Sequence, residues 1–210
     1  MKFFKTLLIS GEEELFIKAK GLTTLAKKSN DELGKLINKK SSYTKISNLK
    51  KRSSNEYFLL SHLITSGSIA PNLIDDMLLL LNKEENILES IFKISRQYIR
   101  YTSKDKKINE YLGNVLLSFN NYAKDSINLL SKMHESKTLS QIKIYRSKIK
   151  EIENEGDMLR DSILDFAYSS DTDFKLFYHI IDLAYMCDDV LDACEDASDL
   201  FLSIMLSILS

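Results

Sequence analysis

The last sixty residues of the chain contain two rows of acidic side chains at helical spacing. The rows are Glu153, Asp157 and Asp161, followed further along by Asp188, Asp192 and Asp196. Residues four apart lie on the same face of an α-helix, so each row should present its carboxylates side by side. Carboxylate oxygens are the donors that hard cations prefer. The residue types and their spacing therefore favour a cation site.

Such rows are unfavourable unless something neutralises them. Like charges at this spacing cost about 0.2–0.5 kcal/mol per pair in an isolated helix. If the two rows face each other in an antiparallel pair, the repulsion grows as the carboxylates leave water. Within residues 151–210 the basic side chains are Arg160 and Lys175. A bound cation would remove the penalty, whereas a solvated acidic face screened by salt and by basic residues elsewhere is the alternative.

Charge is divided unevenly along the 210 residues. The net formal charge is −1, yet residues 151–210 hold 2 Lys/Arg against 15 Asp/Glu, while residues 1–60 hold 13 against 6. A disordered acidic tail would be poor in apolar residues, but this segment is rich in Leu, Ile, Phe and Tyr. We therefore expect a folded acidic region that serves as a cation site or faces a basic surface.

Other chemical signatures are missing from the sequence. No residue three positions before any of the 3 histidines is Glu, which argues against a ferritin-like di-iron bundle. There is no glycine-rich phosphate loop, catalytic triad spacing or Cys-x-x-Cys pair. The basic run from Lys45 to Arg52 could touch a phosphate-bearing partner, although such a run is more often a helix surface, and we expect no nucleic-acid binding.

Few residues in this chain break helices, so the fold should be all-α. It contains 1 Pro and 6 Gly, whereas sheets need frequent turns. The apolar spacing predicts six long antiparallel helices, joined by short links as in a bundle. The expected ranges are about Glu12–Lys40, Thr44–Ser66, Pro71–Tyr101, Ile108–His134, Leu139–Tyr168 and Asp173 to the end. They suggest one domain, 1–210, with an internal repeat of roughly 1–103 and 104–210.

We also expect a cytoplasmic protein. Cys187 and Cys194, seven residues apart on one expected helix, are beyond disulfide reach and are predicted to be reduced thiols. The apolar run at the N-terminus is short and interrupted by Lys5, which argues against an export signal. Leu200–Leu209 is about half the length of a membrane span. This apolar run should complete the core or cover a partner such as a second copy.

Three stretches resemble the PhoU-like phosphate-transport regulators, in particular the short accessory branch associated with Pit-type phosphate transporters. The first is Phe3–Leu7 with the acidic helix start that follows it. The others are Ile152–Asp157, similar to the family's Glu-x-x-Gly-Asp motif, and Cys187–Asp192, similar to its Asp-Asp-x-x-Asp motif. The resemblance extends over nearly the whole chain and implies two pseudo-symmetric three-helix bundles.

The resemblance also implies a metal site, a cellular location and a partner. The family's motifs bind metal, which implies Glu153, Asp157, Asp188 and Asp192 as ligands with Asp189 and Asp161 nearby. A divalent or ferric ion is expected: iron, manganese, magnesium, calcium or zinc. The family acts at the cytoplasmic face of the membrane, where a phosphate transporter or sensor protein would be the partner.

The first half departs from the family pattern. Aligning the halves places Arg52, a cation, where the second half has Glu153, and leaves Glu56, Glu85 and Glu89 as weaker candidate ligands. We therefore expect the first-half site to be lost or weakened. The segment Asp171–Lys175, before the last helix, also follows the family only loosely.

Three functions remain open at this point. The first is a non-enzymatic, metal-binding regulatory or accessory protein of inorganic phosphate transport that acts by protein–protein interaction. The second is a helical scaffold without metal, dimerising through Leu200–Leu209. The third is a carboxylate metallo-phosphohydrolase with two metals, which the lack of a histidine ligand or nucleophile near the acidic rows disfavours.

Overall fold

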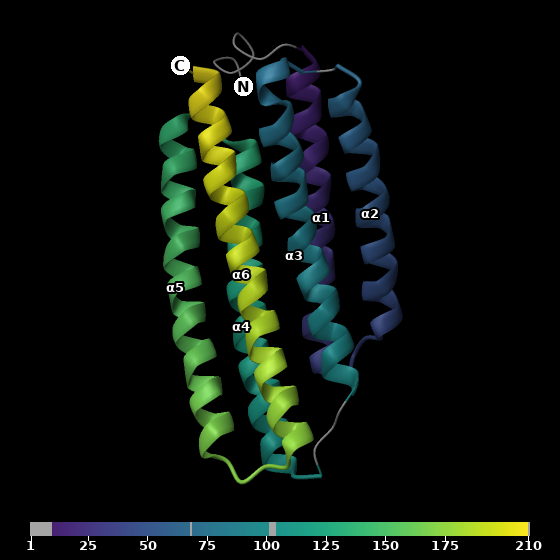
Figure 1. Cartoon of the computed structure of the whole chain (residues 1–210), viewed down its shortest axis with the longest axis vertical. Coiled ribbons are helices and arrows are strands. Elements are labelled where there is room, and N and C mark those ends of the chain that lie inside the picture. The colour runs from purple at the N-terminus through teal and green to yellow at the C-terminus, as the bar shows by residue number, and fades with distance from the viewer. Residues whose placement is uncertain (1–9, 68, 101–103, 210) are drawn as a thin grey trace.

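The computed structural model describes residues 10–67, 69–100 and 104–209, and these residues form a bundle of α-helices that run along one long axis (Figure 1). The helices are α1 Ser10–Ile37, α2 Tyr43–Thr65, α3 Ile74–Arg100, α4 Lys106–Glu135, α5 Leu139–Ser169 and α6 Phe174–Leu209, with a 3₁₀ turn η2 at Pro71–Leu73. The all-α prediction of six long helices is confirmed. The family-like stretch Phe3–Leu7 lies outside the described residues.

Side chains at the helix starts satisfy backbone N–H groups that have no partner within the helix. The Asp105 carboxylate accepts a hydrogen bond from the backbone N–H of Lys107, and Thr138 Oγ1 accepts one from Gln141. Before α6, Asp173 Oδ1 accepts from the backbone N–H of Leu176 at 2.9 Å. These caps explain why α4, α5 and α6 begin within two residues of their predicted starts.

The first three helices contact one another, and so do the last three. The two groups are joined by α1 against α4 and by α3 against α6. Exchanging α1, α2 and α3 for α4, α5 and α6 therefore preserves the pattern of contacts. This is the arrangement expected of two three-helix bundles, whereas the internal sequence repeat stays a prediction.

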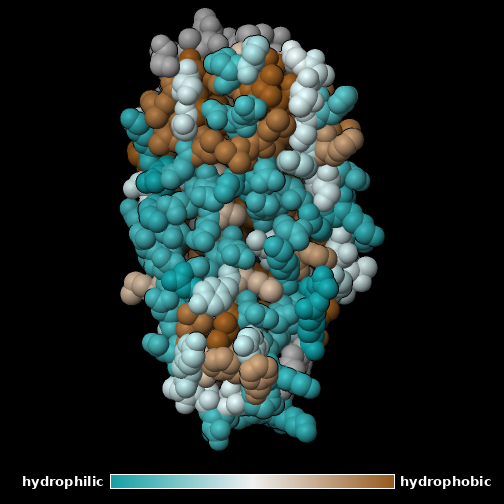
Figure 2. Space-filling model, viewed as in Figure 1, coloured by the Kyte–Doolittle hydropathy of each residue, from teal (hydrophilic) through white to brown (hydrophobic). Residues whose placement is uncertain are grey.

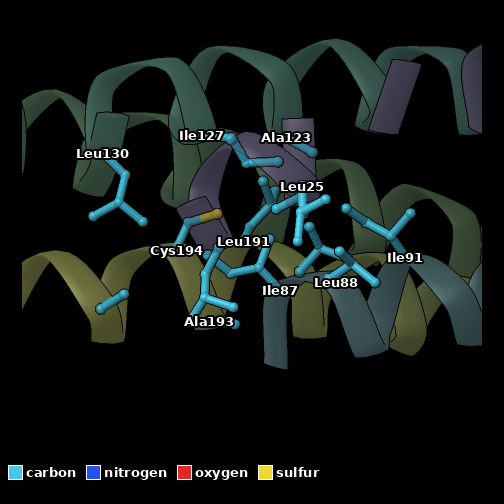
Figure 3. Packing of buried hydrophobic residues seen from close by; sticks show 14 of the residues in the cluster. Leu25, Ile87, Leu88, Ile91, Ala123, Ile127, Leu130, Leu191, Ala193 and Cys194 are labelled. Atoms are coloured by element: carbon cyan, nitrogen blue, oxygen red, sulfur yellow. The ribbon is translucent and has the colours of Figure 1, made fainter. Parts of the chain in front are cut away.

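The apolar core runs along the whole bundle, where the two groups meet. Figure 3 shows Leu25 of α1, Ile87 and Leu88 of α3, Ile127 of α4 and Leu191 of α6 packed together, and these five residues are buried. Cys187 and Cys194 are buried in the same core as free thiols, and burial raises the pKa of both. Neither thiol is available for chemistry at the surface.

Apolar side chains also gather near one end of the molecule. Figure 2 shows them toward the end where both termini lie, above a polar band across the middle of α3, α5 and α6. Of the predicted apolar run at the end of α6, Phe201, Ile204 and Met205 are buried, while Leu206 is 43% exposed. The run mainly completes the core. None of the helices, over the described residues, is long and apolar enough to cross a membrane.

Candidate functional site on helices α5 and α6

The two acidic rows face each other across the contact between α5 and α6. Arg160, on α5, bridges them: its guanidinium nitrogen Nη1 lies 2.7 Å from Asp157 Oδ1 on the same helix and 2.5 Å from Asp188 Oδ2 on α6. Nη2 of Arg160 also lies 3.0 Å from Asp161. One arginine therefore holds three of the predicted site residues, and the three carboxylates raise the pKa of its guanidinium.

A glycine allows this close approach. Gly156 lies between the acidic residues of the α5 motif, and a β-carbon at this position would overlap the Cδ1 methyl group of Leu191. Leu191 belongs to the acidic motif of α6 and is 1% exposed. The glycine in the motif thus has a packing role, since it lets the two helices that carry the acidic rows come together.

A second cation, Lys150, lies closer to the start of α5 than Arg160 does. Lys150 Nζ lies 2.8 Å from Glu153 Oε2 on α5 and 3.0 Å from Glu195 Oε1 on α6, and these hydrogen bonds raise the pKa of its ammonium group. Arg146 reaches α6 in the same way through a paired contact with Asp199. Arg146, Lys150 and Arg160 therefore form a series of cations along α5, each of which holds a carboxylate of α6.

Asp188 and Asp192 differ in their surroundings. Asp188 is only 7% exposed; its Oδ1 has no hydrogen-bond partner within the described part of the chain, and burial raises the pKa of its carboxyl despite the contact with Arg160. Asp192 is exposed, but partial desolvation and the charges of Asp188, Glu153, Asp157 and Asp189 raise its pKa to about 6. Asp189 is exposed. The structure therefore crowds carboxylates together without neutralising all of them.

The fit of these residues to a metal ion is partial. The donor chemistry suits a hard cation, and Asp188 has one free, buried oxygen. However, no group of three or more His, Cys, Asp or Glu side chains within residues 10–67, 69–100 and 104–209 is placed so that it could hold a metal. The basic groups of Arg160 and Lys150 stand between the carboxylates. With the side chains in this arrangement, the carboxylates that the family resemblance implies as ligands do not converge on one ion position.

In the first half of the chain, Lys50 pairs with carboxylates as Lys150 does in the second half. Lys50 of α2 pairs with Glu85 of α3 and lies 2.8 Å from Glu89 Oε2. Glu56 points elsewhere, since its Oε1 would lie 3.6 Å from a β-carbon added at Gly21 of α1. Burial opposes the charge on Lys50, but the two glutamates raise its pKa overall. Two of the weaker candidate ligands thus share a lysine, and the third is turned toward α1.

One buried polar pair was not foreseen from the sequence. Glu84 of α3 and His134 of α4 have side chains that are 0% and 1% exposed, and Glu84 Oε1 lies 2.6 Å from His134 Nε2. Glu84 Oε2 and His134 Nδ1 have no partner among the described residues. The signal was present in the sequence, because Glu84 lies on the apolar face of α3, between Leu80 and Ile87.

The fold and the facing acidic rows define a six-helix bundle that resembles the PhoU-like fold. Among solved structures, the chain is similar to one described as a "putative PhoU-like phosphate regulatory protein" from Shewanella oneidensis MR-1. The match has a TM-score of 0.60 and 13% sequence identity, and it covers 94% of this chain and 98% of the other. At this identity the likeness shows the fold alone. No protein-family model matches the chain, and no curated protein matches it.

Proposed function

We propose that this chain is a non-enzymatic regulatory protein of inorganic phosphate transport that acts by binding a transporter or sensor protein at the cytoplasmic face of the membrane. The observation that supports this proposal is the structural match, over 94% of the chain, to a protein described as PhoU-like and phosphate-regulatory. The motifs at Ile152–Asp157 and Cys187–Asp192 support the same assignment. These motifs are read from the sequence alone, so they support the assignment independently of the structural match.

The acidic surface of α5 and α6 is the part of the chain that we assign to the partner. Residues 151–210 carry a net charge of −13, and Asp189, Asp192 and Asp196 are exposed along one side of α6. Cytoplasmic loops of membrane proteins are enriched in Lys and Arg. An exposed acidic row is complementary to such loops and would accelerate their association by electrostatic attraction.

Metal binding at the same surface is a second component of the proposal. The ligands would be Glu153, Asp157, Asp188 and Asp192, and the ion would be divalent or ferric. The free Oδ1 of Asp188 supports this component, whereas the contacts of Arg160 and Lys150 oppose it. We therefore expect Arg160 to turn away from Asp157 and Asp188 when an ion binds. When bound, the ion would neutralise the two rows and join α5 to α6.

Elemental analysis of untagged protein incubated with iron, manganese or magnesium tests the metal component. We expect stoichiometric metal in the wild type and a loss of metal in Asp157→Ala. Arg160→Gln should bind metal more tightly than the wild type does, because the competing cation is removed. Absence of metal from both the wild type and Arg160→Gln would remove this component and leave a metal-free helical regulator.

Cross-linking in cells followed by recovery of the membrane fraction tests the partner component. A triple charge reversal at the exposed row, Asp189→Lys, Asp192→Lys and Asp196→Lys, should abolish cross-links to a membrane protein. Asp165 is also an exposed acid on α5, and Asp165→Lys provides a control for a change of charge elsewhere. Equal cross-linking by the wild type and the triple variant would contradict an interface at this row.

A further inference from the structure

A groove with a volume of about 380 Å³ lies between α1 and α2, on the basic half of the molecule. Its polar lining comes from both helices: Lys28, Asp31, Glu32 and Lys35 of α1, and Lys45, Asn48 and Arg52 of α2. Apart from the adjacent pair Asp31 and Glu32, these residues are three, four or seven positions apart on each helix, so they share one helix face. The groove thus lies between one polar face of α1 and one polar face of α2.

The groove carries an excess of positive charge. Four basic residues line it, namely Lys28, Lys35, Lys45 and Arg52, together with two acids, Asp31 and Glu32. The formal net charge of the lining is therefore +2. Residues 1–60, to which all of them belong, hold 13 Lys/Arg against 6 Asp/Glu. The surroundings therefore add to the positive potential of the groove and do not cancel it.

Part of the groove already binds an oxyanion, namely the carboxylate of Glu32. Lys35 Nζ lies 2.7 Å from Glu32 Oε1, Lys45 Nζ lies 3.5 Å from Oε2, and the hydroxyl of Ser41 donates a hydrogen bond to Oε2. Lysine ammonium groups and a hydroxyl are also the donors that bind phosphate oxygens. The contacts of Glu32 show that this set of side chains can surround a planar, charged oxygen group.

Two cations of the groove remain unused. Lys28 and Arg52 are exposed, and neither is paired with an acid among the described residues. Asn48, four residues before Arg52, adds an amide donor on the same face of α2. A guanidinium binds two oxygens of a phosphate group at once, whereas a lysine acts as a point charge. These three side chains provide donors from both walls of the groove.

We propose that the groove between α1 and α2 is a binding site for a phosphate-class oxyanion, held by Arg52, Lys28 and Asn48. The net charge of +2 matches a dianion. The site is separate from the acidic rows of α5 and α6, so it requires neither a metal nor the partner of the proposed function. If the chain does regulate phosphate transport, this groove is where it would sense phosphate.

Titration calorimetry with inorganic phosphate at constant ionic strength, adjusted with chloride, tests this site. We expect saturable binding to the wild type and about tenfold weaker binding to Arg52→Gln and to Lys28→Gln, as for loss of one charged hydrogen-bond donor. Lys27→Gln is the matched control, since Lys27 is exposed and does not line the groove. This variant should bind phosphate as the wild type does.

A fourth variant tests the competing carboxylate. Glu32→Gln removes the internal anion and releases Lys35 and Lys45, so it should bind phosphate more tightly than the wild type. A merely structural role of the groove would not produce this gain. Unchanged or weaker binding by Glu32→Gln would contradict the proposal that phosphate competes with this carboxylate in the groove.

Vesicles distinguish free phosphate from a phosphorylated lipid headgroup. Binding of inorganic phosphate, with no preference for phosphatidylglycerol vesicles over phosphatidylcholine vesicles, assigns the groove to the free ion. Vesicle binding that is lost in Arg52→Gln and Lys28→Gln assigns the same groove to a headgroup phosphate. The proposal is overturned if neither probe binds, or if Lys27→Gln weakens binding as much as Arg52→Gln does. Because no membrane partner is present in these assays, their failure would leave the proposed function standing.

Discussion

Arg160 Nη1 of α5 lies 2.5 Å from Asp188 Oδ2 of α6, and this contact connects the two acidic motifs of the chain. The arginine side chain is 22% exposed and the aspartate side chain 10%. Such a contact stabilises the pair of helices mainly because breaking it leaves a buried charge without a partner. The same contact lies between the rows, where the proposed function places a metal ion.

Removal of this arginine should destabilise the protein. We expect Arg160→Gln to lower the free energy of unfolding by about 2 kcal/mol in the absence of metal, because Asp188 loses its cation while it remains buried. Chemical denaturation followed by circular dichroism measures the change. The double variant Arg160→Gln/Asp188→Asn should recover part of the loss, and a double variant less stable than Arg160→Gln would contradict this interpretation.

The glycine of the α5 motif should be required for packing. Gly156→Ala is expected to destabilise the protein by about 1–3 kcal/mol, since its methyl group would overlap Leu191 and force α5 and α6 apart. Gly113→Ala is the matched control, because a β-carbon there meets nothing within 4 Å and alanine favours the helix by up to about 1 kcal/mol. Thermal unfolding compares the two variants. If Gly113→Ala lost as much stability as Gly156→Ala, the contact with Leu191 would not be the cause of the loss at Gly156.

The buried pair of Glu84 and His134 should be costly to break and neutral to remove. We expect His134→Leu to destabilise the protein by about 3 kcal/mol, since Glu84 would stay buried without a partner. The double variant Glu84→Leu/His134→Leu should be close to the wild type or more stable, because both polar groups are replaced by apolar ones. Urea denaturation of the two variants checks the prediction. Equal instability of both would show that packing volume, and not pairing, determines the cost.

Acid should weaken the contacts of Glu32 within the α1–α2 groove. The hydrogen bonds from Lys35 and Ser41 lower its pKa from the usual 4.5 to about 2. Between these two values the unfolded chain binds more protons than the folded one, so this contribution to stability is complete above about pH 5 and is lost as the pH falls toward 2. Glu32 is near the surface, so we expect it to contribute at most about 1 kcal/mol.

The comparison of Glu32→Gln with the wild type, by denaturation between pH 2 and 7, measures this contribution. The difference in stability should be largest at neutral pH and should shrink at acid pH. Glu155→Gln is the control, since Glu155 is exposed on α5 and has no ion-pair partner among the described residues. A difference that grows as the pH falls would reverse the predicted sign.

The helices could be predicted from the sequence to within a few residues, because apolar spacing and capping residues are local signals. The largest discrepancies have local causes too. The first helix ends at Ile37 and not near Lys40, where Lys39 takes up a positive φ of 58°, and the stretch after Pro71 forms a 3₁₀ turn before α3 begins at Ile74. A single sequence contains little information about such turns at helix ends.

The candidate site could be predicted only in part. The spacing of Asp157 and Asp188 placed them on helix faces, and Arg160 was recognised as a local counter-charge. The role of Lys150 was missed, because it lies one residue before the acidic segment and because a flexible lysine can point in many directions. Whether carboxylates converge on an ion or pair with cations depends on such side-chain conformations, which helical spacing does not determine.

Phosphate uptake by cells of the native host is the most direct test of the proposed regulatory role. Uptake of radiolabelled inorganic phosphate should change when the chromosomal copy of this chain is deleted, and expression of the wild-type chain should restore it. Expression of the triple variant Asp189→Lys, Asp192→Lys and Asp196→Lys, at the same level, should not. Phosphate uptake that is identical in the deletion strain and the wild type, under both phosphate-rich and phosphate-poor conditions, would contradict the account.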